Sequence, residues 1–257
     1  MAASKHAPGT FNWFECGSRD QAKSKVFYTQ LFGWGSMDVP MPGGGGQYTL
    51  FKNSSGEDIA GLYKLEGPMM EGVPSNWATY VAVESVDETA KRAAALGGTV
   101  AAEPMDIPGV GRIAFLKDPT GAMIGIGHFD QHPGTSDQGP FGWSELATRD
   151  TARAKAFYTE LFNWGAKPDP KNPYTEFQVG GRSIAGMMAM TPQHGDAPPH
   201  WMPYVMVDDA DQIARRVGEL GGRIYMPPTT IENVGRFTIF ADPAGAVLAA
   251  IKLTHHV

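Results

Sequence analysis

The sequence predicts an α+β protein made of four βαβββ units, grouped as two modules in tandem. The first observation is a repeat: residues 11–35, FNWFECGSRDQAKSKVFYTQLFGWG, align without a gap on residues 141–165, FGWSELATRDTARAKAFYTELFNWG. The second is that a helical pattern between short apolar strands occurs twice within each half of the chain. One helix and several strands per repeat imply sheets that each need a partner to bury one face.

The elements follow in a regular order in the first half. A strand at 12–17 leads through Arg19-Asp20 into a helix at 21–32, QAKSKVFYTQLF, whose apolar residues share one face. The glycines of MPGGGGQ, residues 41–47, predict a hairpin tip or a lid, because glycine runs do not hold a regular strand. Strands are expected near 48–52 and 58–65.

The same pattern then restarts. A strand at 77–83 precedes a helix that begins at Val86 and ends at the Gly97-Gly98 pair. Strands are predicted near 99–103, 111–117 and 122–128, and the turn DPTGA, residues 118–122, opens the last of them. DPAGA recurs at 242–246 in the second half. We therefore predict one module over 8–130, a second over 138–254, and a linker at 131–137.

Composition limits the function classes. With 257 residues, 42% hydrophobic and 19% charged, the chain can bury a large core. The net charge of −6 argues against a nucleic-acid partner. No stretch approaches the roughly 20 apolar residues of a membrane span, and the first ten residues lack a signal-peptide core. The single Cys16 excludes an intrachain disulfide. We expect a cytoplasmic protein that binds no membrane.

The helix FYTQLFGW after "RD", the helix that runs from Val-Asp to Ala-Leu-Gly-Gly, and the DPxG turn together resemble the vicinal oxygen chelate superfamily. That superfamily includes glyoxalase I, bleomycin-resistance proteins and extradiol dioxygenases. The resemblance covers residues 10–253 and fits the tandem form with two glyoxalase-like modules. It implies mixed sheets curled into cups around a small-molecule or metal site, with helices on the outer faces.

The resemblance also implies a divalent ion held by His, Gln or Glu at four strand positions. The matching residues here are Trp13, Gly61, Ala78 and Gly125 in the first half, and Trp143, Gly186, Met202 and Ala249 in the second. Hard divalent ions need several oxygen or nitrogen donors, which these residues do not supply. We therefore predict no metal cofactor, which disfavours metal catalysis of the glyoxalase I or dioxygenase type. The alternative is an atypical metal site around His200.

Strand alternation predicts what faces each cup. Trp13 shares a face with Glu15, and Trp143 with Glu145, while Tyr80 and Tyr204 face the same way as Ala78 and Met202. The small residues at the last strands are expected to leave space for an apolar ligand. The predicted ligand-binding residues are Trp13, Tyr80, Arg112, Trp143, Tyr204 and Arg236.

Glu15 and Glu145 are the candidate catalytic residues. A half-buried carboxylate must be paired, accept hydrogen bonds or carry a raised pKa. Each glutamate is either a general base or ligand anchor, or one half of a Glu–Arg pair with Arg112 or Arg236 that joins neighbouring strands.

Three functional hypotheses follow. The first is a metal-free protein of the bleomycin-resistance kind that binds a small apolar or aromatic molecule. The second is an enzyme, a lyase, isomerase or dioxygenase-like protein, that uses Glu15 or Glu145 as a base or an atypical metal. The third is a ligand-free scaffold. A chain with two joined modules is expected to be a monomer or a weak homodimer.

Overall fold

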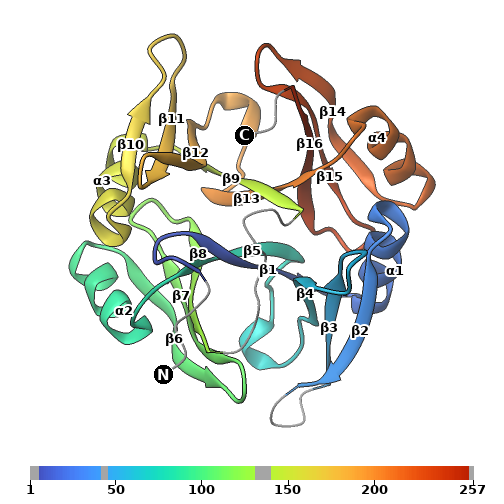
Figure 1. The fold of residues 1–257 in the computed structure, drawn as a ribbon, viewed down its shortest axis with the longest axis horizontal. Coiled ribbons are helices and arrows are strands. Elements are labelled where there is room, and N and C mark those ends of the chain that lie inside the picture. The colour runs from blue at the N-terminus through green and yellow to red at the C-terminus, as the bar shows by residue number, and fades with distance from the viewer. Residues whose placement is uncertain (1–5, 42–45, 131–139, 255–257) are drawn as a thin grey trace. The chain divides into compact units, whose positions relative to one another are not determined.

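The computed structural model describes residues 6–41, 46–130 and 140–254, which form four βαβββ units (Figure 1). The α+β class predicted from the sequence is confirmed. The predicted linker at 131–137 lies outside the described residues, as do residues 42–45 of the predicted hairpin tip.

The first half of the chain supplies two of these units. The first consists of β1 (Phe11–Ser18), α1 (Gln21–Phe32), β2 (Gly35–Pro40), β3 (Gln47–Lys52) and β4 (Asp58–Lys64). A short 3-10 helix, η1 (Pro68–Met70), separates it from the second unit. The second consists of β5 (Asn76–Ala82), α2 (Val86–Ala95), β6 (Thr99–Ile107), β7 (Gly111–Lys117) and β8 (Met123–Phe129).

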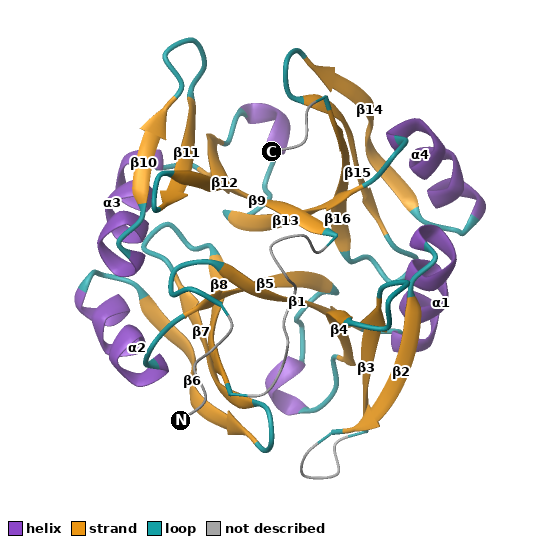
Figure 2. Ribbon diagram, viewed as in Figure 1, coloured by secondary structure: helices purple, strands orange, loops and turns teal. Residues whose placement is uncertain are grey.

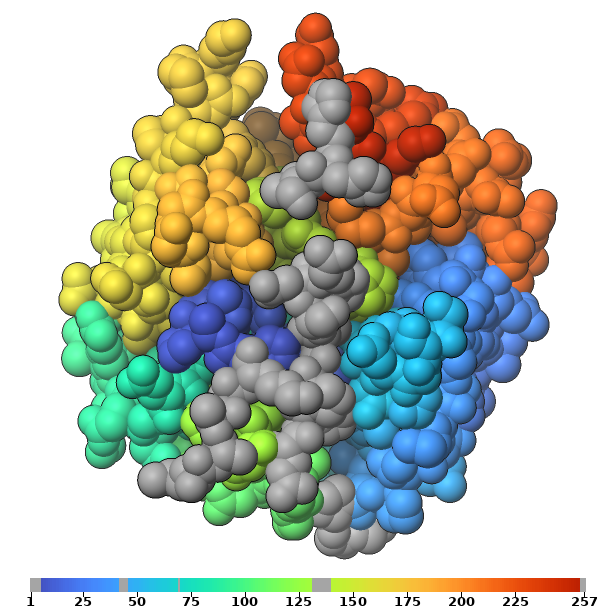
Figure 3. All heavy atoms as spheres, in the orientation of Figure 1, coloured from blue at the N-terminus to red at the C-terminus, as the bar shows by residue number. Residues whose placement is uncertain are grey.

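The second half repeats this order. The third unit consists of β9 (Phe141–Thr148), α3 (Thr151–Phe162), β10 (Gly165–Pro168), β11 (Tyr174–Val179) and β12 (Arg182–Ala189), followed by η2 (Pro192–His194). The fourth consists of β13 (His200–Met206), α4 (Ala210–Glu219), β14 (Arg223–Ile231), β15 (Gly235–Ala241) and β16 (Val247–Leu253). The turn between β10 and β11, at 169–173, is mostly exposed and stands out at the surface in Figure 3.

Each βαβββ unit has four strands that lie side by side in a mixed parallel and antiparallel order, with the unit's helix on one face (Figure 2). In the first unit the strand order is β2-β3-β4-β1, with β1 parallel to β4 and the other pairs antiparallel. The third unit repeats it as β10-β11-β12-β9. Asp20 and Asp150 begin their helices by accepting a hydrogen bond from the backbone N–H three residues later.

The compact bodies of the structure do not follow the two halves of the sequence. Body 1 comprises Met1–Asn12, Ala78–Gly134 and Trp143–Met202. Body 2 comprises Trp13–Trp77, Thr135–Gly142 and Pro203–Val257. Each body therefore combines a βαβββ unit from one half of the chain with a unit from the other. The module boundaries 8–130 and 138–254 stay a prediction drawn from the repeat.

Each body has an apolar core between its two units. In body 1, Val81 and Ile124 of the first half belong to the same buried cluster as Leu146 and Phe157 of the second half. In body 2, the ring of Phe27 lies 6.1 Å from the ring of Phe240, and both side chains are buried. Burying these faces is the main driving force for joining the two units in each body.

A buried Trp–Tyr–Asp group, which we call an anchor, lies in the core of each body. In body 2, Trp77 Nε1 donates a hydrogen bond of 2.8 Å to the hydroxyl of Tyr28, which lies beside the carboxylate of Asp242. In body 1, Trp201 Nε1 donates at 2.8 Å to Tyr158, beside Asp118. Burial, together with these carboxylates, raises the pKa of both tyrosines.

The aspartates of the anchors are the first residues of the two DPxG turns. Asp118 Oδ1 accepts hydrogen bonds from the backbone N–H groups of Thr120, Gly121 and Ala122, which fix the turn. Asp242 Oδ1 accepts from Ala244 and Ala246 in the same way. The anchors therefore connect the helix of one unit to the turn before the last strand of the other.

The two anchors differ in the side-chain donors to their aspartates. Ser24 Oγ donates to Asp242 Oδ2 at 2.6 Å, whereas the residue matching Ser24 in the repeat is Ala154. Conversely, Thr120 Oγ1 donates to Asp118 Oδ1 at 2.8 Å, whereas the residue matching Thr120 is Ala244. Asp118 Oδ2 is buried, and apart from the Tyr158 hydroxyl beside it no donor reaches this oxygen among the described residues. A buried carboxylate oxygen with few donors costs stability.

None of the helices in the described residues combines the length and the apolar run needed to cross a bilayer.

We expect Ser24→Ala to lower the free energy of unfolding by about 2 kcal/mol, because it removes a charge-assisted hydrogen bond in a buried place. The reciprocal change, Ala154→Ser, supplies a donor for Asp118 Oδ2 and should raise the free energy by about 1 kcal/mol. Urea denaturation followed by circular dichroism measures both. Equal destabilisation by the two variants would contradict this account of the anchors.

Candidate functional site

The first candidate site, the first cluster, is made of Trp13, Glu15, Tyr48 and Gly61 in body 2. Trp13 and Glu15 are two apart on β1 and share one sheet face, and Glu15 lies opposite Gly61 on β4. Trp13 Nε1 donates to the Tyr48 hydroxyl at 3.0 Å, and that hydroxyl donates to Glu15 Oε2 at 2.5 Å. The three side chains thus form one directed hydrogen-bond chain that ends on a carboxylate.

Gly61 makes this arrangement possible. A Cβ atom at Gly61 would lie 1.7 Å from the Tyr48 hydroxyl and 2.4 Å from the adjoining ring carbon, far inside van der Waals contact. Tyr48 comes from β3, which is antiparallel to β4, and its side chain lies across β4 toward β1. The sequence therefore needs a residue without a side chain at this point of β4.

The second cluster, in body 1, has the same construction. Trp143 Nε1 donates to the Tyr174 hydroxyl at 3.1 Å, and Tyr174 donates to Glu145 Oε2 at 2.8 Å. Glu145 lies opposite Gly186 across β9 and β12. A Cβ atom at Gly186 would again lie 1.7 Å from the tyrosine hydroxyl. Two separate parts of the chain thus build the same group of side chains.

The electrostatics keep both tyrosines protonated. Burial raises the pKa of Tyr48 and of Tyr174, and the negative charges of Glu15 and Glu145 raise it further. A neutral phenol donates its proton to the carboxylate and accepts the indole N–H with its oxygen. The clusters are therefore suited to fixing a carboxylate in position beside an aromatic surface.

The side chains of the two clusters do not fit a divalent metal ion. The indole N–H of Trp13 is a donor without a lone pair, Gly61 has no side chain, and the Tyr48 hydroxyl lies over Gly61. Trp143, Gly186 and Tyr174 repeat this pattern. Across the described residues, no three side chains of His, Cys, Asp or Glu gather as a metal-binding group. The absence of a metal cofactor stays a prediction.

The ring of Tyr80 occupies the space beside Gly125 that was expected to be open. The two residues lie opposite each other on β5 and β8, and a Cβ atom at Gly125 would lie 2.4 Å from the Tyr80 ring. Tyr80 also contacts Phe115 at 5.2 Å between ring centroids and is only 1% exposed. The expected open space beside Gly125 is therefore occupied by the protein's own side chain. Tyr204, opposite Ala249, is buried against Phe237.

Arg112 and Arg236 have carboxylate partners other than the two glutamates. Arg112 donates to both oxygens of Asp87, at 2.8 and 2.9 Å, and to Asp106 at 2.9 Å. Arg236 donates to Asp211 at 2.6 and 2.8 Å. These arginines lower the pKa of Asp87 and of Asp211. Each arginine lies on the third strand of its unit and reaches the first turn of that unit's helix, so it joins those elements instead of β1 or β9.

His200 was the alternative centre of a metal site. Its Nδ1 lies 2.9 Å from the backbone carbonyl oxygen of Pro198, and the ring is partly exposed at the start of β13. Pro198 O is thus an ordinary hydrogen-bond acceptor for the ring.

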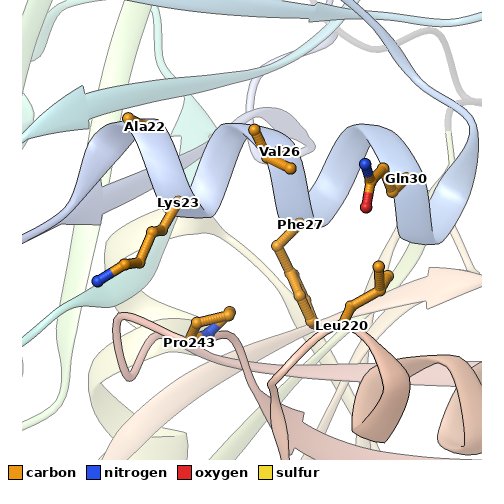
Figure 4. A pocket seen from close by; sticks show the side chains of 7 residues that line it. All are labelled: Ala22, Lys23, Val26, Phe27, Gln30, Leu220 and Pro243. Atoms are coloured by element: carbon orange, nitrogen blue, oxygen red, sulfur yellow. The ribbon is translucent and has the colours of Figure 1, made fainter.

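A shallow apolar groove of about 490 Å³ lies elsewhere in body 2, and Figure 4 shows Phe27 of α1 pointing toward Leu220 and Pro243 across it. Its lining residues are Ala22, Lys23, Val26, Phe27, Gln30, Leu220 and Pro243. None of these is acidic or belongs to either cluster. The groove offers an apolar surface without the convergent polar groups of a specific site, so the clusters are the stronger candidates.

Sequence reasoning found Trp13, Glu15, Trp143 and Glu145 but missed the tyrosines that join them. A signal was present, since the dipeptide Tyr-Thr occurs near the start of both QYTLFK at Gln47–Lys52 and YTEFQV at Tyr174–Val179. Its meaning depends on the register of β3 on β4 and of β11 on β12, which places each tyrosine over a glycine.

The model of the Glyoxalase/Bleomycin resistance protein/Dioxygenase superfamily matches residues 10–126 and residues 140–249. "Putative glyoxylase CFP32" of Mycobacterium tuberculosis (strain CDC 1551 / Oshkosh) is 36% identical over 255 residues, which cover 97% of both chains. "Anthracycline biosynthesis protein DnrV" of Streptomyces peucetius is 33% identical over 265 residues, covering 97% of this chain and 95% of that protein. The resemblance inferred from the sequence motifs is confirmed.

Solved structures show the same fold. A Mn(II)-bound glyoxalase from Novosphingobium aromaticivorans superposes with a TM-score of 0.65 at 17% identity, covering 97% of this chain and 84% of that one. The 2,3-dioxygenase LapB from Pseudomonas sp. KL28 gives a TM-score of 0.65 at 12% identity, covering 98% of this chain and 95% of that one. At such identities the likeness is one of fold alone.

We expect Gly61→Ala and Gly186→Ala each to lower the free energy of unfolding by about 2 kcal/mol, because the new methyl group displaces the tyrosine from its glutamate. Gly218→Ala is the matched control. Gly218 is exposed in α4 with open space around its Cα, so alanine there should be neutral or stabilising by about 0.5 kcal/mol. Chemical denaturation measures all three, and a neutral Gly61→Ala would contradict the described packing.

Proposed function

The chain belongs to the Glyoxalase/Bleomycin resistance protein/Dioxygenase superfamily, and we propose that it binds a small apolar or aromatic molecule at the first and second clusters without a metal ion. The observation that carries this proposal is the repeated Trp–Tyr–Glu hydrogen-bond chain. It combines two aromatic side chains with one oriented carboxylate, as small-molecule sites commonly do.

The donor chemistry of the clusters supports a metal-free site. At the first and fourth strands of both units, where the resemblance places metal ligands, the chain has tryptophan and glycine. A tyrosine hydroxyl lies against each glycine and is engaged with a glutamate. An organic ligand can use the indole and phenol rings by stacking and the carboxylate by hydrogen bonding, whereas a hard cation gains little from either ring.

The names of two relatives support an aromatic ligand. The proteins DauV and DnrV, from Streptomyces sp. (strain C5) and Streptomyces peucetius, are named for anthracycline biosynthesis, and both align over 97% of this chain. Anthracyclines contain fused planar rings. From these names we infer only the class of ligand for this chain, which is a small planar aromatic molecule.

The second candidate function is an enzyme in which Glu15 or Glu145 acts as a general base. The short hydrogen bond from Tyr48 to Glu15 favours it, since a base must be held in one orientation relative to its substrate. The name of the mycobacterial relative also refers to an enzyme. A ligand-free scaffold is the third candidate, and it predicts no binding at either cluster.

For the binding proposal, we expect 9-fluorenone, a planar tricyclic ketone, to raise the melting temperature and quench tryptophan fluorescence. Trp13→Leu combined with Trp143→Leu should weaken this binding at least tenfold, because both aromatic surfaces are lost. Val26→Ser is the control, since Val26 is 54% exposed in the apolar groove. Weaker binding in Val26→Ser alone would place the ligand in the groove and contradict the proposal.

Two measurements separate the proposal from the enzyme. Protein purified without chelator should contain less than a tenth of an equivalent of Fe, Zn, Ni or Mn, and a stoichiometric metal would overturn the metal-free site. Incubation with 1-indanone in deuterium oxide should give no protein-dependent exchange of the α-hydrogens. Exchange that disappears in Glu15→Gln or Glu145→Gln would establish the general base instead.

A further inference from the structure

The two clusters share their Trp–Tyr–Glu chain but differ in the next pair of residues on the same sheet face. In body 2, Gly17 of β1 lies opposite Tyr63 of β4, two residues beyond the Glu15–Gly61 pair. In body 1, Ala147 lies opposite Met188 at the corresponding place beside Glu145 and Gly186. The first cluster therefore has a second phenol where the second cluster has a thioether.

The two differences depend on each other. A Cβ atom at Gly17 would lie 2.9 Å from Leu65 Cδ2, 3.0 Å from the Tyr63 hydroxyl and 3.1 Å from the ring carbon that carries it. Those distances are too short for comfortable contact, so the phenol lies over Gly17 because that residue has no side chain. Ala147 has the methyl group that Gly17 lacks, and Met188, which is flexible, lies opposite it.

The Tyr63 hydroxyl is placed to act as a donor. Burial and the negative charge of Glu15 raise the pKa of Tyr63, so the phenol keeps its proton at neutral pH. The Tyr63 side chain is partly exposed, and its hydroxyl lies over Gly17 on the same face as Glu15. Its proton is available to a ligand acceptor on the same face as Glu15.

The charge of Glu15 restricts which acceptor can bind there. A ligand carboxylate or phosphate would be repelled by Glu15, whereas a neutral carbonyl oxygen accepts a hydrogen bond without adding charge. Leu50, which faces the same way from β3, adds apolar surface. The matching residue in body 1 is Glu176, which accepts hydrogen bonds from Ser183 and Lys167. The second cluster thus has a Glu176–Lys167 ion pair where the first cluster has the apolar side chain of Leu50.

We propose that Tyr63 is a specificity-determining residue that donates a hydrogen bond to the carbonyl oxygen of a neutral aromatic ligand, and that only the first cluster selects for this group. The proposal rests on the function proposed above, since it assumes that an aromatic molecule binds at the clusters. It assigns different ligand preferences to two sites that share one Trp–Tyr–Glu chain.

A matched pair of probes tests it. 9-Fluorenone and fluorene have the same fused rings and differ by the carbonyl group. Tyr63→Phe keeps the ring and removes the hydroxyl. It should weaken fluorenone binding at the first cluster about fivefold and leave fluorene binding unchanged. Tyr225→Phe is the control, because Tyr225 of β14 is 55% exposed and lies outside both clusters, and it should change neither. Isothermal calorimetry and tryptophan quenching give both dissociation constants.

Two further variants complement Tyr63→Phe. Gly17→Ala pushes the Tyr63 phenol and the Leu65 side chain away from β1 and should reproduce the selective loss of fluorenone affinity. Ala147→Gly with Met188→Tyr places a phenol in the second cluster and should raise fluorenone affinity there about fivefold, without an effect on fluorene.

The outcomes separate this inference from the proposed function. If both probes bind and Tyr63→Phe weakens them equally or not at all, Tyr63 is not the carbonyl donor, although the clusters remain binding sites. If neither probe binds the unmodified protein, the proposed function fails, and the role of Tyr63 fails with it. A selective loss of fluorenone affinity in Tyr63→Phe and in Gly17→Ala supports the proposal.

Discussion

The hydrogen bond from a buried tryptophan to a buried tyrosine beside an aspartate is the constraint on which each body depends. Trp77 and Tyr28 meet Asp242 in body 2, and Trp201 and Tyr158 meet Asp118 in body 1. The tyrosine lies on a helix of one unit and the aspartate opens the last strand of the other. A polar group in an apolar core is stable only when its hydrogen-bond partners are also in place. This contact therefore fixes how the two units pack.

The two clusters lie on the sheet face opposite to the one that packs against the core. On β1, Phe14 and Cys16 are buried on the face that packs against the core, and the alternating residues Trp13 and Glu15 face the other way. Because the core fixes the position of β1 and its neighbours, the hydroxyl of Tyr48 reaches Glu15 without any flexible loop. A site built on paired strands is pre-organised, which reduces the entropy cost of binding.

Local patterns predicted much of this, and long-range register explains what they missed. Helices α1 and α2 and strand β1 were predictable from apolar periodicity and turn residues, but β2 was not, because Ser36 to Asp38 are exposed and carry no alternation. Tyr48 and Tyr174 acquire their role only once each lies over a glycine of the next strand. The composition of the bodies was also unpredictable, since an internal repeat does not reveal which faces pack together.

A comparison of the two halves of the chain distinguishes the residues that the fold requires from those that differ between the two clusters. Both clusters retain the tryptophan, tyrosine, glutamate and glycine, because removing any one leaves a buried polar group unpaired or a tyrosine without room. The next pair along the strands is under no such requirement, and there the halves differ: Gly17 with Tyr63 against Ala147 with Met188. The change is coupled in each half, so it leaves the packing of both sheets intact and changes only whether a phenol or a thioether lies beside the glutamate.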